Sequence, residues 1–397
     1  MTSEVTQTFE VEIERILPGG VGLAHALGKT VFVWLAAPGD RLRVAVERQQ
    51  GNVLFANIKE ILSPSPVRVE APCPYFGRCG GCDFQQLTYD AQLAAKAEMI
   101  RDCLQRIARL EVIPEFVVHP SPEVWGYRAR ATWQFDRQEK TIGYYERASR
   151  RVCDVVECAV LVPELREALR RVRSVPWAEF PETMKHLEVV AANNEVSFAP
   201  EFDNCETREL SLSVGDETYA FNAEAFFQVN QELLEAILAS VFRDADGQTA
   251  IDLYCGVGLF TLPLARRFQR VIAVEANPTA TRFARRNLQR AQLSNASVVT
   301  TSVSEWIRHH IAGVGPIDYV LLDPPRAGAE SVVIKGILDA RPKLISYISC
   351  DPATLARDLK KLVEGGYHLE SLAAFDMFPQ THHVETIARL RPNSLEH

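Results

Sequence analysis

The chain has 397 residues, too many for one ordinary hydrophobic core, so we expect two or three domains. Hydrophobic residues make up 47% and charged residues 24%, which is typical of globular proteins and excludes long disordered tracts. No apolar run reaches the roughly 18 residues of a transmembrane helix. The segment Met1 to Glu4 lacks the pattern of a signal peptide, so we expect a cytoplasmic protein with no membrane partner.

Short strands separated by turns are predicted over residues 1–64. Apolar and polar residues alternate in several stretches, residues 9–13, 29–34, 41–46 and 53–61. Turn sequences at 18–20 and 38–40 lie between them. Five short strands in so small a module indicate an OB-like β-barrel, a common RNA-binding platform, although a barrel used only for packing has the same pattern.

A smaller α/β region is predicted over residues 67–220, after a Ser-Pro linker at 63–66. One helix is expected at 89–110. Four strands are expected at residues 132–135, 141–145, 187–190 and 195–198. The region begins with three closely spaced cysteines, so we expect a central domain that contains a cysteine cluster.

Strands and helices alternate over residues 221–392. Apolar strands are predicted at residues 250–254, 271–275, 319–323 and 344–348. This alternation predicts a Rossmann-like, doubly wound parallel sheet that binds ligands at the carboxyl ends of its strands.

The turn after the first of these strands has the pattern of a cofactor-binding loop. Gly256-Val257-Gly258 allows backbone N–H groups and a helix N-terminus to approach a ligand closely. Glu275 ends the next strand, where a carboxylate accepts hydrogen bonds from ribose hydroxyls; the alternative is that it only caps the helix near Asn277. The loop lacks the third glycine of a dinucleotide fingerprint, which favours S-adenosylmethionine over NAD because no pyrophosphate must be bound.

Two more strand ends carry residues of catalytic type. The third strand ends in Asp323-Pro324-Pro325-Arg326. An acidic or amide residue followed by two prolines at a strand end recurs in methyltransferases that act on nucleobases, although an ordinary exit from strand to loop has the same pattern. The fourth runs into Ser349-Cys350-Asp351-Pro352, where a nucleophile is expected in such sheets, although inert core cysteines also occur there. Glu385 follows a polar loop and is either a base or a rim carboxylate.

The cysteines of the central region have metal-ligand spacing. A chain without a signal peptide is expected in a reducing compartment, which favours metal or catalytic thiols over disulfides. Cys73, Cys79 and Cys82 supply three thiolates, and a fourth, later cysteine would complete a tetrathiolate site. Structural zinc and an iron–sulfur cluster fit this pattern equally well.

Two basic stretches allow a nucleic-acid partner. Residues 128–151 contain seven basic and three acidic residues, and residues 266–290 contain seven and one, although the net charge of the chain is -8. In the second stretch the arginines share one face of a predicted helix, so a solvated helix face is the alternative explanation.

Five motifs, taken in order, resemble the RNA uridine-5-methyltransferase family over nearly the whole chain. They are Phe227-Gln228-Val229-Asn230, the loop from Asp252 to Gly258, Asp323 to Arg326, Ser349 to Pro352, and His383-Val384-Glu385. The N-terminal strands resemble the TRAM domain of that family. One departure is Asp351, where the family usually has asparagine; it concerns positioning rather than the chemistry.

The resemblance implies a role for each motif. Cys350 would add to C6 of a flipped-out uracil, and Glu385 would remove the C5 proton after methyl transfer. The residues implied to hold S-adenosylmethionine are Gln228, Tyr254, Gly256, Glu275 and Asp323. The Cys79-Gly80-Gly81-Cys82 string resembles members that bind a [4Fe-4S] cluster, and the family's pattern favours Cys158 over Cys153 as the fourth ligand.

The combination of barrel and cluster resembles members that modify 23S ribosomal RNA, with the T-loop uridine of tRNA as the alternative substrate. Two other classes remain open. An RNA cytosine-5-methyltransferase would have Pro-Cys where this chain has residues 323–326, and a non-catalytic RNA-binding module would not need Cys350 and Glu385. No obligate protein partner is evident from the sequence.

Overall fold

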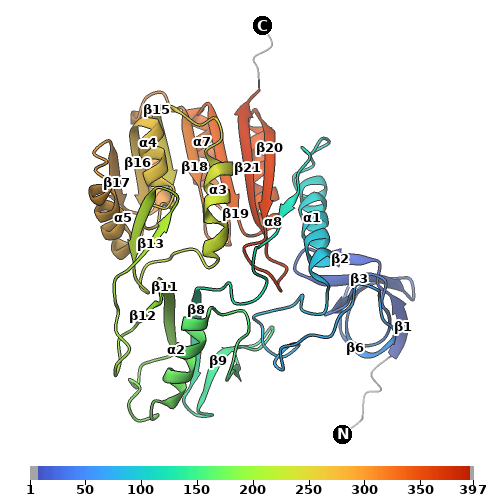
Figure 1. Ribbon diagram of the computed structural model, residues 1–397. Helices are drawn as coiled ribbons and strands as arrows, with labels where there is room; N and C mark the ends of the chain where they lie inside the picture. Colours follow the sequence, from blue (N-terminus) through green and yellow to red (C-terminus); the bar gives the residue numbers. More distant parts are fainter. Residues whose placement is uncertain (1–7, 394–397) are drawn as a thin grey trace.

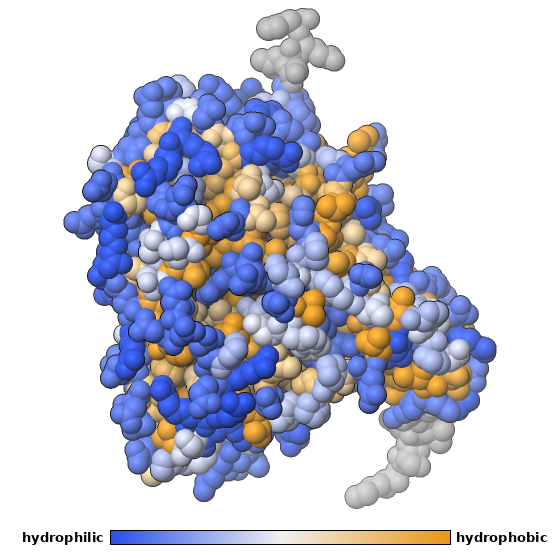
Figure 2. Space-filling model, in the orientation of Figure 1, coloured by the Kyte–Doolittle hydropathy of each residue, from blue (hydrophilic) through white to orange (hydrophobic). Residues whose placement is uncertain are grey.

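The computed structural model describes residues 8–393, which form an N-terminal strand module, a central sheet and a larger C-terminal α/β part (Figure 1). The segment Met1 to Glu4, considered above for a signal peptide, lies outside the described residues. Hydrophilic side chains cover most of the face shown in Figure 2. Within residues 8–393, no helix combines the length and the apolar character needed to cross a membrane.

The N-terminal module is a curled six-stranded sheet in the order β1-β5-β6-β4-β3-β2. Its strands are β1 (Thr8–Glu12), β2 (Arg15–Leu17), β3 (Val21–Ala26), β4 (Lys29–Trp34), β5 (Arg41–Gln50) and β6 (Val53–Ser63). The predicted alternation turns side chains such as Val31, Val33 and Leu42 into its core. The four predicted ranges correspond to β1, β4, β5 and β6. The structure adds β2 and β3, which pair with each other across the turn at Gly19 and Gly20 and bring the five strands expected to six.

The central sheet is antiparallel, in the order β10-β9-β8-β11-β12. It consists of β8 (Arg130–Asp136), β9 (Thr141–Tyr145), β10 (Val152–Asp154), β11 (His186–Ala192) and β12 (Glu195–Ala199). Helix α2 (Pro163–Ser174) packs against β11 and β12 and buries Leu165 and Leu169 in a core that includes Trp133. The hairpin of β13 (Leu210–Val214) and β14 (Glu217–Phe221) leads from this sheet into the C-terminal part.

The C-terminal part is an eight-stranded sheet in the order β17-β16-β15-β18-β19-β21-β20-β7. Its strands are β7 (Val118–His119), β15 (Gly247–Leu253), β16 (Phe268–Glu275), β17 (Ala296–Thr300), β18 (Tyr319–Leu322), β19 (Leu344–Ser349), β20 (Tyr367–Phe375) and β21 (Glu385–Pro392). The pairs from β17 through β19 are parallel, and β21 is antiparallel to both of its neighbours. The parallel strands β17 through β19 have the doubly wound arrangement that was predicted, whereas the antiparallel strand β21 departs from the predicted all-parallel sheet.

Helices cover both faces of that sheet (Figure 1). They are α3 (Leu234–Val241), α4 (Thr261–Arg267), α5 (Pro278–Arg290), α6 (Val303–His310), α7 (Ser331–Ala340) and α8 (Pro352–Glu364), with short 3-10 turns η1 (Gln231–Leu233) and η2 (Ile311–Gly313). Their apolar stripes meet strands that are buried along their whole length, as expected for a parallel sheet.

Helix α1 (Tyr89–Arg106) connects the N-terminal module to the C-terminal sheet. One side of α1 places Ala95 and Met99 against Ile16 of the N-terminal module. Another side places Ile100 and Leu104 in the core of the C-terminal sheet, beside α8. An ion pair of 2.9 Å between Arg15 and Asp102 adds a polar contact to the N-terminal module. The helix is therefore buried between two parts of the molecule.

Candidate active site

The register of the eight-stranded sheet brings together predicted residues from three parallel strands. Leu253 of β15 pairs with Val274 of β16 on one side and with Leu322 of β18 on the other. The residues that follow these three are Tyr254, Glu275 and Asp323. Because parallel strands end at the same edge, Tyr254 lies between the two carboxylates at the carboxyl end of the sheet.

Strand β21 adds a carboxylate beside the predicted nucleophile. Ser349 of β19 pairs with Thr386 of β21, so the next residues outward, Cys350 and Glu385, lie opposite each other. Since β18 is the other neighbour of β19, Asp323 ends the adjacent strand. The thiol, the carboxylates and the glycine loop therefore meet at one edge of the sheet.

The glycine loop after β15 leaves room for a ligand. Tyr254 and Gly256 have φ angles of +66° and +55°, and a Cβ added at Gly256 would meet no atom within 4 Å. The Oε2 atom of Glu275 accepts a hydrogen bond from the Gly256 N–H at 3.2 Å, and its Oε1 accepts one from the Asn277 N–H at 2.7 Å. The N-cap residue of α5 is Asn277, so helix capping does not explain the position of Glu275. The remaining lone pairs of the Glu275 carboxylate can accept hydrogen bonds from ribose hydroxyls.

An unpartnered acceptor lies beneath this loop. Asp252 is fully buried, and its Oδ2 accepts a hydrogen bond from Thr261 Oγ1 at 2.5 Å. Its Oδ1 has no partner among the described residues. Burial raises the pKa of this carboxyl to about 7. The open space at Gly256 and this free acceptor fit a ligand that donates hydrogen bonds, and the sequence alone did not single out Asp252.

Gln228 lies in the segment between β14 and η1. Its side chain is half-buried, and the preceding Phe227 stacks on Phe221 with ring centroids 4.2 Å apart. The Asn277 side chain donates to the carbonyl of Glu224 at 3.3 Å. The segment that carries Gln228 is thereby attached to the start of α5, two residues from Glu275.

Burial raises the pKa of Asp323, Glu385 and the Cys350 thiol, and neighbouring negative charge adds to the shift for Glu385 and Cys350. Burial raises the pKa of Asp323 to about 7. Glu385 is 5% exposed, and burial followed by the charge of Asp323 raises its pKa well above the usual range. Burial, followed by the charge of Glu385, raises the pKa of the Cys350 thiol to about 12, while the Arg326 charge acts in the opposite direction. The free protein therefore carries a protonated thiol at neutral pH.

Asp351 is the N-cap of α8. Its Oδ1 accepts hydrogen bonds from the N–H groups of Ala353 and Thr354 at 2.8 and 2.9 Å. Aspartate and asparagine are both good N-cap residues, because either side chain offers an oxygen to the first turn. The departure from the usual asparagine therefore leaves the support of Cys350 by α8 intact.

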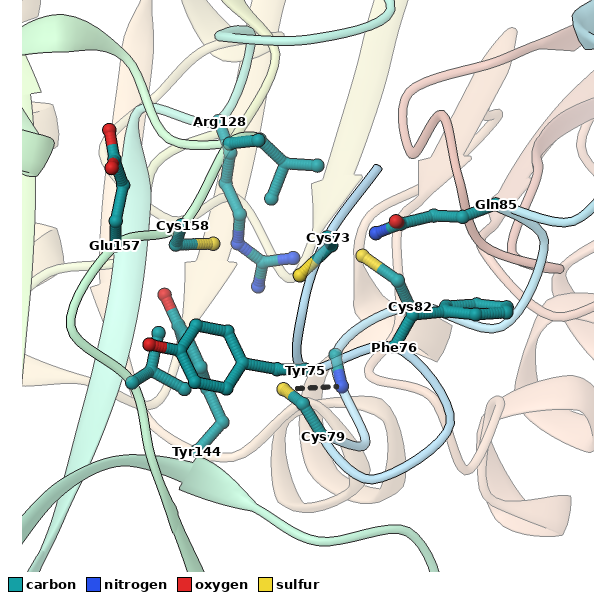
Figure 3. A pocket seen from close by; sticks show the side chains of 14 residues that line it. Cys73, Tyr75, Phe76, Cys79, Cys82, Gln85, Arg128, Tyr144, Glu157 and Cys158 are labelled. Carbon is teal, nitrogen blue, oxygen red and sulfur yellow. Dashed lines mark hydrogen bonds between the residues drawn. The ribbon is translucent and has the colours of Figure 1, made fainter. Parts of the chain in front are cut away.

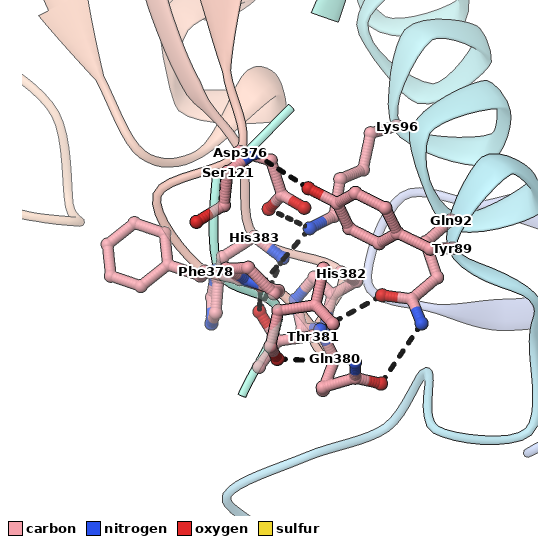
Figure 4. Close-up of polar contacts among 12 residues, drawn as sticks. Tyr89, Gln92, Lys96, Ser121, Asp376, Phe378, Gln380, Thr381, His382 and His383 are labelled. Atoms are coloured by element: carbon pink, nitrogen blue, oxygen red, sulfur yellow. Dashed lines mark hydrogen bonds and ion pairs between the residues drawn. The ribbon is translucent and has the colours of Figure 1, made fainter. Parts of the chain in front are cut away.

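A polar network supports the loop that leads into Glu385, residues 376–384 (Figure 4). Lys96 and Asp376 form a fully buried ion pair of 2.5 Å, and the side chains of Gln92 and Gln380 are hydrogen-bonded at 3.0 Å. Burial lowers the pKa of His383 to about 3, so this imidazole is neutral. No local sequence pattern marks these hydrogen-bonded and ion-paired residues as partners, because they are far apart in the chain.

The four predicted cysteine ligands line one cavity (Figure 3). Cys73, Cys79, Cys82 and Cys158 share it with the Arg128 guanidinium and aromatic side chains, whereas Cys153 is fully buried and is not part of the lining. Burial raises the pKa of the Cys79 and Cys82 thiols to about 12. Within residues 8–393, no three His, Cys, Asp or Glu side chains are close enough to hold a single metal ion.

Comparisons with known proteins show which family the chain belongs to. A family model described as tRNA (uracil-5-)-methyltransferase matches residues 182–391. The 23S rRNA (uracil(1939)-C(5))-methyltransferase RlmD of Thiobacillus denitrificans is 34% identical over 93% of this chain and 96% of its own length. A protein of Aquifex aeolicus named only as an RNA methyltransferase is 31% identical over 96% of this chain and 98% of its own.

A solved structure covers nearly the same range. The crystal structure of the Pyrococcus abyssi tRNA (uracil-54, C5)-methyltransferase in complex with S-adenosyl-L-homocysteine matches with a TM-score of 0.72 and 26% identity, over 96% of this chain and 100% of that one. The fold and the glycine loop are those of an S-adenosylmethionine-dependent methyltransferase. Within that class, the chain belongs to the RNA (uracil-5-)-methyltransferase family.

The Glu275→Ala variant tests the cofactor side of the site. Loss of a charged acceptor for ribose hydroxyls should weaken S-adenosylmethionine binding by about 1.5–3 kcal/mol in calorimetry. Glu364→Ala, at the distant exposed end of α8, is the matched control and should bind normally. Unchanged affinity in Glu275→Ala would mean that Glu275 serves only the backbone of its own loop.

The raised pKa of Cys350 predicts slow alkylation of the free enzyme. With a pKa near 12, the thiolate is scarce at pH 8, and its fraction should rise by about tenfold per pH unit up to pH 11. Mass spectrometry of the Cys350 peptide after timed iodoacetamide exposure measures this rate. A rate that levels off near pH 8 would contradict the assigned environment of the thiol.

Proposed function

We propose that this enzyme methylates C5 of a uridine in 23S rRNA, with Cys350 as nucleophile and Glu385 as base. The observation that carries the proposal is the register of β19 and β21, which sets these two side chains opposite each other beside the glycine loop. A thiol and a base on two neighbouring, paired strands can act on adjacent carbons of one uracil ring.

The first step belongs to Cys350. Uracil C5 is too weak a nucleophile to attack a methyl group directly. Cys350 first loses its thiol proton to solvent. Addition of the resulting thiolate to C6 moves the electrons of the C5–C6 double bond toward the C4 carbonyl, and the enolate so formed is nucleophilic at C5. When bound, S-adenosylmethionine supplies the electrophilic methyl group, and the side chains proposed to hold it are Gln228, Tyr254, Glu275 and Asp323, with Gly256 leaving the space.

The second step belongs to Glu385. After C5 carries the methyl group, the carboxylate removes the C5 proton, the double bond re-forms, and the C6–S bond breaks to release Cys350. Burial, followed by the negative charge of Asp323, raises the pKa of Glu385, which makes its carboxylate form a stronger base. The reaction needs the uracil ring between the two side chains, so the target nucleotide must leave its stack.

The RNA class is inferred from the relatives and from the N-terminal module. The RlmD relative carries a 23S rRNA specificity in its name, and the Pyrococcus abyssi enzyme a tRNA specificity. The identity to the first is the higher, at 34% against 26%. We assign residues 8–63 to a TRAM-like, RNA-binding barrel. The exposed basic residues of 128–151, Lys140, Arg150 and Arg151, offer further positive charge for RNA. The thiol-rich chain fits a cytoplasmic location.

We infer that Cys73, Cys79, Cys82 and Cys158 hold a [4Fe-4S] cluster. Thiols of such a cluster bind different iron atoms, so they stand farther apart than the ligands of one ion, which is consistent with the cavity and with the lack of a single-ion site among the described residues. The Arg128 guanidinium would balance negative charge on the thiolates. The alternative is structural zinc, which metal analysis of the purified protein distinguishes from a cluster.

Purified protein should be brown and contain about four iron and four sulfide per chain. Cys82→Ser removes one ligand and should lower iron content and visible absorbance together. Cys153→Ser, which leaves the cavity lining unchanged, should keep both. Stoichiometric zinc in a colourless protein would defeat the cluster assignment.

Variants of the two catalytic residues should stop the reaction at different points. Cys350→Ala cannot form the bond to C6 and should give neither product nor adduct, while still binding S-adenosylmethionine. Glu385→Gln keeps the shape of the side chain but not its basicity, so it should methylate once and remain joined to RNA. A denaturing gel should show this slow-migrating band, and the double variant should lack it; normal turnover by Glu385→Gln would refute the assignment.

The substrate is tested with transcripts. Incubation with 23S rRNA and with tRNA, followed by nucleoside mass spectrometry, should yield 5-methyluridine from the 23S transcript. Methylation of tRNA alone would favour the T-loop uridine of tRNA as the substrate. Formation of 5-methylcytosine would mean that the enzyme is an RNA cytosine-5-methyltransferase.

A further inference from the structure

The loop at 376–384 leads from β20 into Glu385, yet much of its polar support comes from a segment nearly three hundred residues earlier in the chain. That segment is residues 83–96, the end of the cysteine loop and the first turns of α1. Figure 4 shows side chains of α1 directed toward this loop.

Two residues of α1 hold the loop from one side. Gln92 Nε2 donates to Gln380 Oε1 at 3.0 Å, and the Gln380 N–H donates to Gln92 Oε1 at 2.9 Å. Lys96 Nζ donates to Asp376 and, at 3.1 Å, to the carbonyl of Phe378. Gln92, Lys96, Asp376 and Gln380 are all buried, so water does not replace these contacts when one is lost.

Asp83 holds the loop from the other side. Its Oδ1 accepts from the His382 N–H at 2.8 Å, and its Oδ2 lies 2.5 Å from His382 Nδ1. The N–H groups of Asp83 and Phe84 both donate to the Gln380 carbonyl, at 3.1 and 3.0 Å. Gln380 itself has φ = +68°, a left-handed conformation that a non-glycine residue keeps only when its surroundings hold it.

The turn at Gly20 of the N-terminal module packs against the contact between Asp83 and His382. A Cβ added at Gly20 would lie 3.1 Å from His382 Cβ and 3.2 Å from Asp83 Oδ2, so only a glycine fits the turn without displacing the pair. Three parts of the molecule therefore meet where Asp83 and His382 touch.

The contacts of Asp83 and Gln92 support the loop before Glu385, and they do not involve Cys350 or the glycine loop. Cys350 is supported by β19 and α8, and the glycine loop by β15 and β16, whereas Asp83 and Gln92 bond to the loop that ends at Glu385. We propose that Asp83 and Gln92 are positioning residues for the proton-removal step: they hold Gln380 and His382 so that Glu385 meets C5 of a uracil bound to Cys350. This inference rests on the proposed function, because it needs Glu385 to be the base.

Hydrogen exchange tests the contacts without any reaction. In Gln92→Leu the Gln380 amide loses its acceptor, and in Asp83→Ala the His382 amide loses its own, so each should exchange faster than in the wild type. Asp83→Asn keeps an oxygen for the His382 N–H and should restore slow exchange. Asp102→Asn, on the same helix but paired with the N-terminal module, is the matched control and should leave both amides protected.

Single-turnover kinetics test the role. With saturating RNA and S-adenosylmethionine, Asp83→Ala and Gln92→Leu should form the Cys350–RNA adduct at the wild-type rate. Both variants should release the RNA about ten- to a hundredfold more slowly, because a displacement of the base by up to about 1 Å costs that much in rate. Cofactor affinity should not change. Asp83→Asn should recover most of the release rate, and Asp102→Asn should release normally.

The outcomes separate this inference from its premise. If Glu385→Gln traps the adduct while Asp83→Ala and Gln92→Leu release it at the wild-type rate, the positioning role is wrong and the base assignment stands. If Glu385→Gln traps nothing, the base assignment itself is wrong. If the two variants slow adduct formation and release equally, their contacts serve general folding, and the positioning role is likewise overturned.

Discussion

The site depends on one constraint, the pairing register of the C-terminal sheet. Parallel strands β16, β15 and β18 end at the same edge, and this sets Glu275, Tyr254 and Asp323 side by side. The antiparallel strand β21 then brings Glu385 opposite Cys350. A one-residue slip in either pairing would turn these side chains to the other face of the sheet, so the backbone hydrogen bonds of the sheet specify the chemistry.

The same edge concentrates acidic groups in a buried place, and that has a chemical consequence. Burial raises the pKa of Asp323, Glu385 and the Cys350 thiol, and repulsion from neighbouring carboxylates adds to the shift for Glu385 and Cys350. A carboxylate with a raised pKa is a stronger base, but the thiol beside it is a poorer nucleophile until it loses its proton.

The sequence predicted what depends on local pattern. It identified the strands that lead into Tyr254, Glu275 and Asp323 and three of the cysteines that share a cavity, because apolar periodicity and motif spacing carry that information. The fourth cysteine, Cys158, came from the family resemblance. It did not predict that α1 would pack against the C-terminal sheet or that Gln92 would bond to Gln380. Those contacts join residues 288 positions apart through ordinary polar side chains, and no local signal marks them. Asp83 follows Cys82 directly, so one segment serves both the cysteine cavity and the loop before Glu385.

The central claim is that Cys350 and the methyl-transfer site act on one and the same uracil ring. An RNA transcript containing 5-fluorouridine tests this most directly, because a C5–F bond cannot be broken by a base and the intermediate persists. Mass spectrometry of the digested complex should find a fluorouridine that carries one added methyl group and is joined to the Cys350 peptide. A methylated but unattached nucleotide, or attachment at another residue, would contradict the account.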